Sequence, residues 1–276
     1  MDNTNIYALS LCAGVGGIDL GLRLVSPRIR TICYVEGEAY TAEILAARME
    51  EGHLDSAPIW TDLRTFDGRP WRGAVDIVTA GFPCQPFSVA GKRRYEADER
   101  HLWPFIARIV EECQPSLIFL ENVSIRAFIE PWRDLRELGF SLSRPFACTA
   151  AELGAGHLRR RVFVLAYRKH RPQNEPGRRS WESGEGSSEH RPISSDAEGE
   201  QMGTSRLSRE SGFRVDWWAC EPGVERMVRR APDRVDRDRA LGNLCIPIVA
   251  GYVFARLVEE IKCDAEFRYN NLRRNT

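Results

Sequence analysis

Short apolar runs alternate with segments of helical periodicity over the first 167 residues, and this alternation is the strongest constraint on the fold. Alternating strands and helices form parallel sheets with helices on both faces. We therefore predict an α/β fold with a doubly wound, mostly parallel sheet. The expected strands are Tyr7–Cys12, Ile29–Val35, Ile59–Asp62, Val75–Ala80, Ser116–Leu120, Phe140–Ala147 and Arg161–Tyr167, and the expected helices are Ile18–Leu24, Ala39–Met49, Ile106–Cys113 and Trp132–Leu138.

One cysteine stands on a stiff turn directly after a predicted strand. Cys84 follows Val75–Ala80 in the stretch AGFPCQPFS, between Pro83 and Gln85-Pro86. Proline fixes φ and restricts the residue before it, so this turn aims the thiol in one direction. A lone cysteine is commonly a small buried hydrophobe, and the residues alone leave that interpretation open. The position at the end of a strand favours a nucleophile.

A glycine-rich turn joins the first strand to the first helix. It reads Ala13-Gly14-Val15-Gly16-Gly17, and such a turn lets backbone N–H groups approach a ligand closely. Glu36 ends the second strand 19 residues after Gly17, where nucleotide-binding α/β proteins place the partner of the ribose hydroxyls. The same pattern also fits a turn that only packs a helix and a solvated glutamate.

Length and charge exclude few functions. The 276 residues suit one large domain with a small appendage, and 39 basic residues balance 39 acidic ones, so any DNA-binding surface must arise from local clustering. The eight cysteines form no CxxC pair, which argues against a zinc module and a disulfide framework. The start of the chain lacks a signal-peptide pattern, and the apolar stretch Ile246–Val258 is too short to span a bilayer. We expect an intracellular protein.

Five motifs in order carry a resemblance to a known family. They are the glycine turn, Pro83-Cys84-Gln85, Glu121-Asn122-Val123, the arginines of 159–161 and Gly242-Asn243. In this order they resemble the DNA (cytosine-5) methyltransferases over about residues 7–167 and 235–260. The resemblance implies transfer of a methyl group from S-adenosylmethionine to carbon-5 of cytosine in double-stranded DNA.

The resemblance also implies a mechanism without a metal ion. The Cys84 thiolate adds to carbon-6 of a cytosine that has been flipped out of the duplex. Glu121 binds N3 and the exocyclic amine, which requires a carboxyl that carries or shares a proton, and burial at a strand end raises its pKa accordingly. Arg159 and Arg161 alternate at a strand entry, face one side, and hold the cysteine loop, the base oxygen and a phosphate.

The resemblance assigns further residues to cofactor and DNA. The predicted S-adenosylmethionine contacts are Cys12, Ala13, Gly14, Gly16, Gly17, Glu36, Asp62, Leu63, Gly81, Pro83, Leu102 and Asn243, and the predicted DNA contacts are Gln85, Ser88 and Arg93. Cys12 replaces the family's usual phenylalanine, and Leu244-Cys245 replace smaller residues, so we predict altered cofactor affinity. His157 replaces the glutamine at the start of the arginine motif, which affects one contact of that motif.

The expected organisation follows from the same resemblance. Residues 1–167 form the catalytic and cofactor-binding domain, 168–235 a small, partly disordered target recognition region, and 236–276 a helix returning to the first domain, with its helical part at Ile248–Ile261. The stretch 168–212 is polar and short for a recognition region. We expect a monomer in the cytoplasm of a bacterium, encoded there or by a phage, with a restriction endonuclease as partner.

Three other functions remain open on the sequence. The same chemistry could act on RNA, since a relative with the same motifs methylates tRNA. The fold could serve as a non-catalytic DNA-binding protein, although Cys84 and Glu121 are both present. A nicotinamide-dependent dehydrogenase would need GxGxxG spacing, which this glycine turn lacks.

Overall fold

The computed structural model describes residues 5–83, 101–168 and 244–274, with side chains as far as Lys262 in the last helix. The strands are β1 (Ile6–Leu11), β2 (Ile29–Val35), β3 (Ile59–Trp60), β4 (Ile77–Gly81), β5 (Leu117–Asn122), β6 (Ser141–Leu142), β7 (Phe146–Thr149) and β8 (Arg160–Tyr167). The α-helices are α1 (Gly17–Val25), α2 (Ala39–Glu50), α3 (Trp103–Cys113), α4 (Ile129–Glu137) and α7 (Pro247–Arg274), and short 3-10 turns are η1 (Arg69–Trp71), η2 (Ile125–Phe128) and η3 (Ala151–Leu153).

The described strands form one sheet in the order β3-β2-β1-β4-β5-β8-β6, with β7 also paired to β8. Strands β1 to β5 pair in parallel with one another, whereas β8 is antiparallel to β5, β6 and β7. The prediction of a mostly parallel α/β sheet is therefore confirmed. Because β1 lies between β2 and β4, the chain direction across the sheet reverses at β1, and open α/β sheets bind ligands at the carboxyl ends of strands beside such a reversal.

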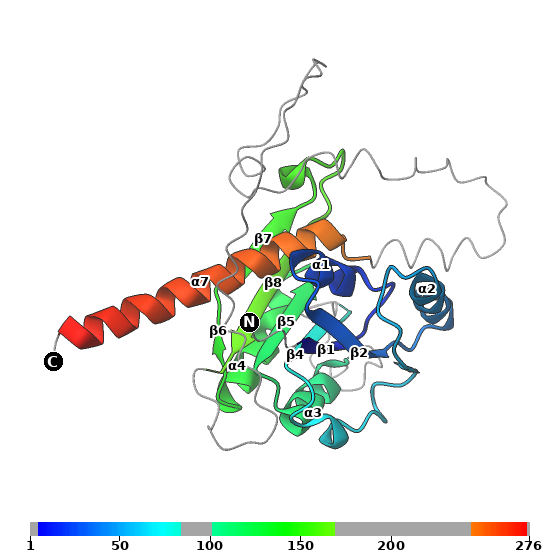
Figure 1. Ribbon diagram of the computed structural model, residues 1–276, viewed down its shortest axis with the longest axis horizontal. Coiled ribbons are helices and arrows are strands. Elements are labelled where there is room, and N and C mark those ends of the chain that lie inside the picture. The colour runs from blue at the N-terminus through cyan, green and yellow to red at the C-terminus, as the bar shows by residue number, and fades with distance from the viewer. Residues whose placement is uncertain (1–4, 84–100, 169–243, 275–276) are drawn as a thin grey trace, which may run out of the picture.

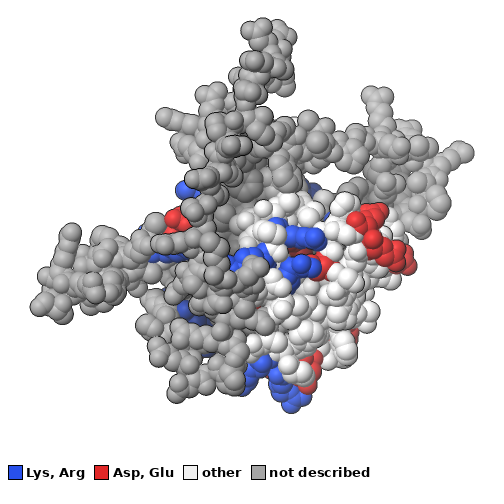
Figure 2. All heavy atoms as spheres, in the orientation of Figure 1, with Lys and Arg blue, Asp and Glu red and all other residues white. Residues whose placement is uncertain are grey.

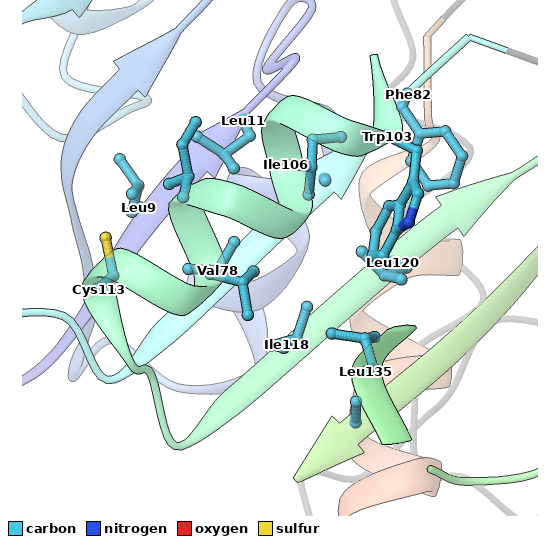
Figure 3. Packing of buried hydrophobic residues seen from close by; sticks show 14 of the residues in the cluster. Leu9, Leu11, Val78, Phe82, Trp103, Ile106, Cys113, Ile118, Leu120 and Leu135 are labelled. Atoms are coloured by element: carbon cyan, nitrogen blue, oxygen red, sulfur yellow. The ribbon is translucent and has the colours of Figure 1, made fainter. Parts of the chain in front are cut away.

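Helices cover both faces of the sheet (Figure 1). Helices α3 and α4 pack on one face, and Figure 3 shows Ile106 and Cys113 of α3 above Leu9, Val78 and Ile118 of the sheet. Helices α1 and α7 pack on the opposite face against the alternate residues of the same strands, such as Ala8, Ile77 and Phe119. Successive side chains of a strand point to opposite faces. Odd-numbered residues of β4, β5 and β8 therefore face α1 and α7.

Helix α7 crosses α1 at very close range. A Cβ atom on Gly21 would lie 2.4 Å from the carbonyl oxygen of Pro247, and one on Gly251 would lie 2.6 Å from the carbonyl oxygen of Gly21. The helix predicted for Ile248–Ile261 is confirmed and continues to Arg274, beyond the sheet (Figure 1). The first turns of α7 therefore pack directly against α1, on the same face of the sheet.

The single strand predicted for Phe140–Ala147 is wrong, because two strands, β6 and β7, occupy this stretch. Pro145 has no N–H group to donate to a strand ladder and disfavours regular structure before it. Ser143 bridges the interruption: its N–H donates to the carbonyl of Leu165 at 2.8 Å, and its Oγ accepts from the N–H of Leu165 at 3.0 Å. The strand predicted for Ile59–Asp62 is likewise shorter, ending at Trp60.

The predicted recognition region lies almost wholly within residues 169–243, outside the described residues, so the division into domains stays a prediction. Within the described ranges, none of the helices combines the length and apolar character that a bilayer crossing requires.

Candidate active site

The glycine turn between β1 and α1 contains one open glycine and two that are packed against protein. Gly14 has φ +56°, and a Cβ added to it would meet no heavy atom of the described residues within 4 Å. A Cβ on Gly16 would lie 2.4 Å from Leu54 Cδ1, and one on Gly17 would lie 2.0 Å from the Cys245 carbonyl oxygen. Gly14 is therefore the position where a ligand could approach the backbone, whereas Gly16 and Gly17 permit close packing.

Glu36 fixes the glycine turn to the end of β2. Its Oε2 accepts from the N–H of Gly14 at 2.7 Å, and its Oε1 accepts from the N–H of Glu38 at 2.8 Å. The Ala13 N–H donates to Val35 O at 3.1 Å, which adds a second link. The carboxylate is buried, and each oxygen keeps a lone pair for another donor. This arrangement fits the hydroxyl groups of a nucleoside beside the open Gly14.

Cys12 adopts φ 50° at the start of the same turn, and its setting keeps its thiol protonated. Burial, reinforced by the charge of Glu36, raises the pKa of Cys12 to about 12. Burial raises the thiol pKa of the other described cysteines as well, to about 11 or 12 for Cys33, Cys113 and Cys148, and well above the usual value for Cys245. None of the described cysteines is thus suited to act as a thiolate nucleophile.

The remaining predicted cofactor residues follow the carboxyl ends of the strands. Asp62 comes after β3, and its Oδ1 accepts from the N–H of Arg64 at 2.9 Å. The Leu63 side chain is buried in the core, so only its backbone could face a ligand. Leu102 is partly buried before α3, and Pro83 is exposed after β4. Asn243 lies outside the described residues.

Glu121 lies near the carboxyl end of β5, on the face covered by α1 and α7. The residue is 6% exposed, and it pairs in register with Gly81 of β4. A Cβ on Gly81 would lie 3.2 Å from Glu121 Oε2, so the glycine leaves room for the carboxylate. Burial raises the pKa of Glu121 to about 7, although the charges of Arg161 and Arg159 oppose this shift. The predicted elevation of this pKa is therefore confirmed.

Arg161 and Arg159 both act on Glu121 but make different contacts. Arg161 is buried in β8, and its Nε lies 2.8 Å from Glu121 Oε1. Arg159 precedes β8 with φ 21°, and its Nε donates to the carbonyl oxygen of Leu244 at 2.9 Å. Its Nη2 donates to the same oxygen. Sequence spacing predicted that both face one side, and both charges do reach Glu121. The contact of Arg159 with Leu244 was not predicted.

The predicted nucleophile and the predicted DNA contacts lie outside the described residues: Cys84, Gln85, Ser88 and Arg93. The residues that flank this segment are described and touch each other. The rings of Phe82 and Trp103 have centroids 5.9 Å apart, and Figure 3 shows the two side chains next to each other. Trp103 Nε1 also donates to Asp134 Oδ2 at 2.8 Å. The described residues on either side of the segment therefore lie close together, beside the carboxyl end of β4.

Sequence reasoning gave no role to Asn122, which follows Glu121 and connects two strand ends. Its amide nitrogen donates to the Phe82 carbonyl oxygen at 3.0 Å, and its Oδ1 accepts from the N–H of Val123 at 2.8 Å. An asparagine at a strand end was the available sequence signal, because its amide can donate one hydrogen bond and accept another and so can link two backbone segments. Asn122 thereby holds the start of the Cys84 segment next to Glu121.

Sequence reasoning also missed Asp19, a carboxyl buried between α1 and the sheet. Its Oδ2 accepts from Ser10 Oγ at 2.8 Å and its Oδ1 from Thr31 Oγ1 at 3.0 Å. Burial raises the pKa of Asp19 to about 6, against the two hydroxyl donors. An acidic residue beside Ile18 and Leu22 on the apolar face of α1 was the available signal.

Comparison with known proteins places these features in a family. The C-5 cytosine-specific DNA methylase model matches residues 6–209. The chain is 32% identical over 166 residues to the type II methyltransferase M.CviJI of Paramecium bursaria Chlorella virus IL3A, covering 58% of this chain and 43% of that protein. It is 36% identical over 174 residues to the type II methyltransferase M.HhaI of Haemophilus parahaemolyticus, covering 60% and 50%.

Among solved structures, the S. pombe Dnmt2 methyltransferase matches with a TM-score of 0.51 and 22% identity, over 60% of this chain and 52% of that one, which supports the fold. The chain spans about half the length of the curated relatives it matches. With the family model matching most of the chain, and with the glycine turn, Glu36, Glu121 and Arg161 at the carboxyl ends of the described parallel strands, the protein belongs to the C-5 cytosine-specific DNA methylase family.

Proposed function

We propose that the protein transfers a methyl group from S-adenosylmethionine to carbon-5 of cytosine in DNA. The observation that carries the proposal is the buried Glu121 carboxyl, which lies 2.8 Å from Arg161 Nε and has a pKa of about 7. A carboxyl with this pKa can hold or share a proton at neutral pH. Membership of the cytosine-specific family supports cytosine as the base that this carboxyl meets.

The glycine turn and Glu36 suit S-adenosylmethionine. Gly14 leaves open space beside its backbone, and Glu36 is a buried carboxylate whose oxygens are already oriented by two N–H groups. In this proposal Glu36 accepts hydrogen bonds from the ribose hydroxyls, while the turn lies against the amino-acid part. When bound there, S-adenosylmethionine supplies an electrophilic methyl group on a sulfonium. The leaving group is then neutral S-adenosylhomocysteine.

Cytosine needs activation, because its carbon-5 is a poor nucleophile. In the proposed reaction the Cys84 thiolate forms a bond to carbon-6, and electron density moves toward N3. Glu121 shares its proton with N3, and Arg161 stabilises the carboxylate as the proton moves. Carbon-5 then bonds to the methyl group. A water molecule removes the proton from carbon-5, the bond from carbon-6 to sulfur breaks, and N3 returns its proton to Glu121, so that the thiolate and the protonated carboxyl are both restored.

The burial of Glu121 supports a reaction in which the base leaves its helix. The residue is 6% exposed at the end of β5, where a paired base within a duplex could not reach it. We therefore include extrusion of the target nucleotide in the proposal, at a cost of a few kcal/mol that contacts in the site offset. The described cysteines all have raised thiol pKa values, which supports Cys84, in the family motif, as the nucleophile.

Bisulfite sequencing of DNA from cells that express the full chain tests the proposal. We expect methylated cytosines in a fixed sequence context, and none above background with Cys84→Ser or in cells without the gene. Equal modification in all three samples contradicts the proposal. Purified protein with labelled S-adenosylmethionine, given duplex DNA or tRNA, separates the DNA enzyme from the RNA alternative, because only the true substrate acquires label.

A restriction endonuclease of the same specificity is part of this proposal, since the curated relatives carry type II names. Such an enzyme pair requires one fixed recognition sequence. Methylated sites that share no common sequence in the bisulfite experiment would contradict this part alone.

A further inference from the structure

We propose that the turn formed by Val123, Ser124 and Ile125, together with Arg126 and Arg160, contacts the duplex DNA that flanks the extruded nucleotide. Val123 is 50% exposed and Ile125 is 58% exposed. The inference rests on the proposed function, and it assigns a nucleic-acid surface to residues that carry no role in the reaction. Val123 and Ile125 supply the apolar contact, and the two arginines supply the charge.

Strand register places this turn at the mouth of the Glu121 site. Strands β5 and β8 are antiparallel, with Glu121 opposite Phe163 and Asn122 opposite Val162. The residues after Asn122 therefore leave the sheet beside Arg160, where β8 begins. Glu121 and Arg161 lie buried just inside this edge. A nucleotide that reaches Glu121 must pass this edge, so its neighbours in the duplex come to rest on it.

The turn is held rigidly, although its apolar side chains face outward. Asn122 Oδ1 accepts from the N–H of Val123 at 2.8 Å, and Ser124 Oγ accepts from the N–H of Arg126 at 3.3 Å. The turn leads into η2, whose Phe128 is buried against Phe82. These contacts fix Val123 and Ile125 in an exposed position. Exposed apolar side chains on a rigid support are typical of an interaction surface.

The charges beside the turn favour nucleic acid over a protein or a membrane as the partner. Arg126 and Arg160 are exposed on either side of the apolar residues, and the nearby Glu130 is engaged by His101 at 2.9 Å. Apolar side chains contact unstacked bases, and flanking arginines bind phosphates. On the face shown in Figure 2, the described surface carries a small mixed group of basic and acidic side chains, and acidic side chains gather at one edge.

Serine substitutions in the full chain test the contact. The probe is a duplex that carries the methylated sequence found by bisulfite sequencing, with 2-aminopurine at the target position to report extrusion by fluorescence. We expect Val123→Ser with Ile125→Ser to weaken duplex binding roughly tenfold, the scale of losing two apolar contacts, and to reduce the 2-aminopurine signal. S-adenosylmethionine affinity and Tm should stay unchanged. Val123→Ile, which keeps an apolar side chain at this position, should bind the duplex more tightly than Val123→Ser does.

A matched control is Leu24→Ser, which changes an apolar side chain that is 36% exposed on α1. It should leave duplex binding unchanged. The Arg126→Gln and Arg160→Gln variants should each reduce the slope of log Kd against log salt by about 1, as expected for one lost phosphate contact. The charge and apolar variants thus report the two parts of the surface separately.

Three outcomes overturn the inference while leaving the proposed function intact. Unchanged duplex affinity and fluorescence in the double variant would show that DNA does not meet the turn. An equal loss with Leu24→Ser would show a general effect of surface substitution. A lowered Tm with weakened S-adenosylmethionine binding would show that the chain itself covers these residues. Failure of the proposed function would appear instead as an unmodified genome with the unsubstituted protein.

Discussion

Nε of Arg161 lies 2.8 Å from Oε1 of Glu121, and the two side chains are both nearly excluded from solvent at the end of the sheet. Opposite charge at this distance lowers the pKa of a carboxyl, yet burial has the larger effect and the pKa of Glu121 reaches about 7. The site therefore holds a carboxyl that can be protonated beside a cation that stabilises its ionised form. Several measurable consequences depend on this balance.

Stability should depend on pH through Glu121. Its pKa is about 7 in the folded protein against an ordinary value of 4.5, so the folded state holds a proton that the unfolded state has lost between these values. The free energy of unfolding should then fall as pH rises from about 4.5 to 7 and be level above, with a total change of about 3 kcal/mol at most. Glu121→Gln should remove this part of the slope in urea unfolding at pH 5, 6, 7 and 8. An identical pH dependence in both proteins would contradict it.

Asp19 should contribute in the same direction over a lower pH range. Burial raises its pKa to about 6 from an ordinary value of 3.8, so its contribution to stability declines between about 4 and 6 and is constant above. Asp19→Asn keeps the size of the side chain near Ser10 and Thr31 while removing the charge. We expect the variant to lose the slope below pH 6 and to keep the part that Glu121 causes. Loss of both parts would mean that the two carboxyls titrate as one unit.

Two of the three glycines of the glycine turn should respond differently to alanine. Gly17→Ala places a Cβ 2.0 Å from the Cys245 carbonyl oxygen, so the chain before α7 must shift. The free energy of unfolding should fall by about 3 kcal/mol, at the upper end of the usual cost of overpacking, and Tm should fall with it. Gly14→Ala meets open space among the described residues and costs only about 1 kcal/mol for its positive φ. Gly14→Ala should instead weaken S-adenosylmethionine binding in calorimetric titration. Equal Tm losses would contradict this division of roles.

The pH profile of kcat should follow the charge of Arg161. In the proposed reaction Glu121 is active with its proton, so kcat should decline as pH rises past about 7. Arg161 lowers the pKa of Glu121, and Arg161→Gln should therefore move this decline to higher pH while reducing the maximal rate. Single-turnover rates from pH 6 to 9 measure both. A lower rate with an unmoved profile would mean that Arg161 does not control the proton of Glu121.

Features that depend on neighbouring residues could be predicted from the sequence. Apolar runs located the strands, and an acidic residue at the end of such a run indicated that Glu121 would be buried with a raised pKa. Features that join distant residues could not be predicted. The Leu244 carbonyl accepts a hydrogen bond from Arg159, which lies 85 positions earlier in the chain. The Cys245 carbonyl leaves no room for a side chain at residue 17. Backbone atoms carry no sequence signal, so such contacts become visible only when the chain is folded.

The interruption at Ser143 shows the same limit on a smaller scale. Residues 140–147 have the composition of one strand, with Pro145 as the single warning. The chain divides there because Ser143 uses its own side chain to satisfy the N–H of Leu165. Propensity alone does not distinguish that local arrangement from a continuous ladder.

Covalent trapping is the most direct test of the proposed chemistry. A duplex with 5-fluorocytosine at the methylated position, incubated with the protein and S-adenosylmethionine, should give a stable complex, because fluorine at carbon-5 cannot leave as a proton. Digestion and mass spectrometry should locate the methylated base on the peptide containing Cys84, and Cys84→Ser should give no complex. A methylating preparation that forms no adduct, or an adduct at any other residue, would contradict the account.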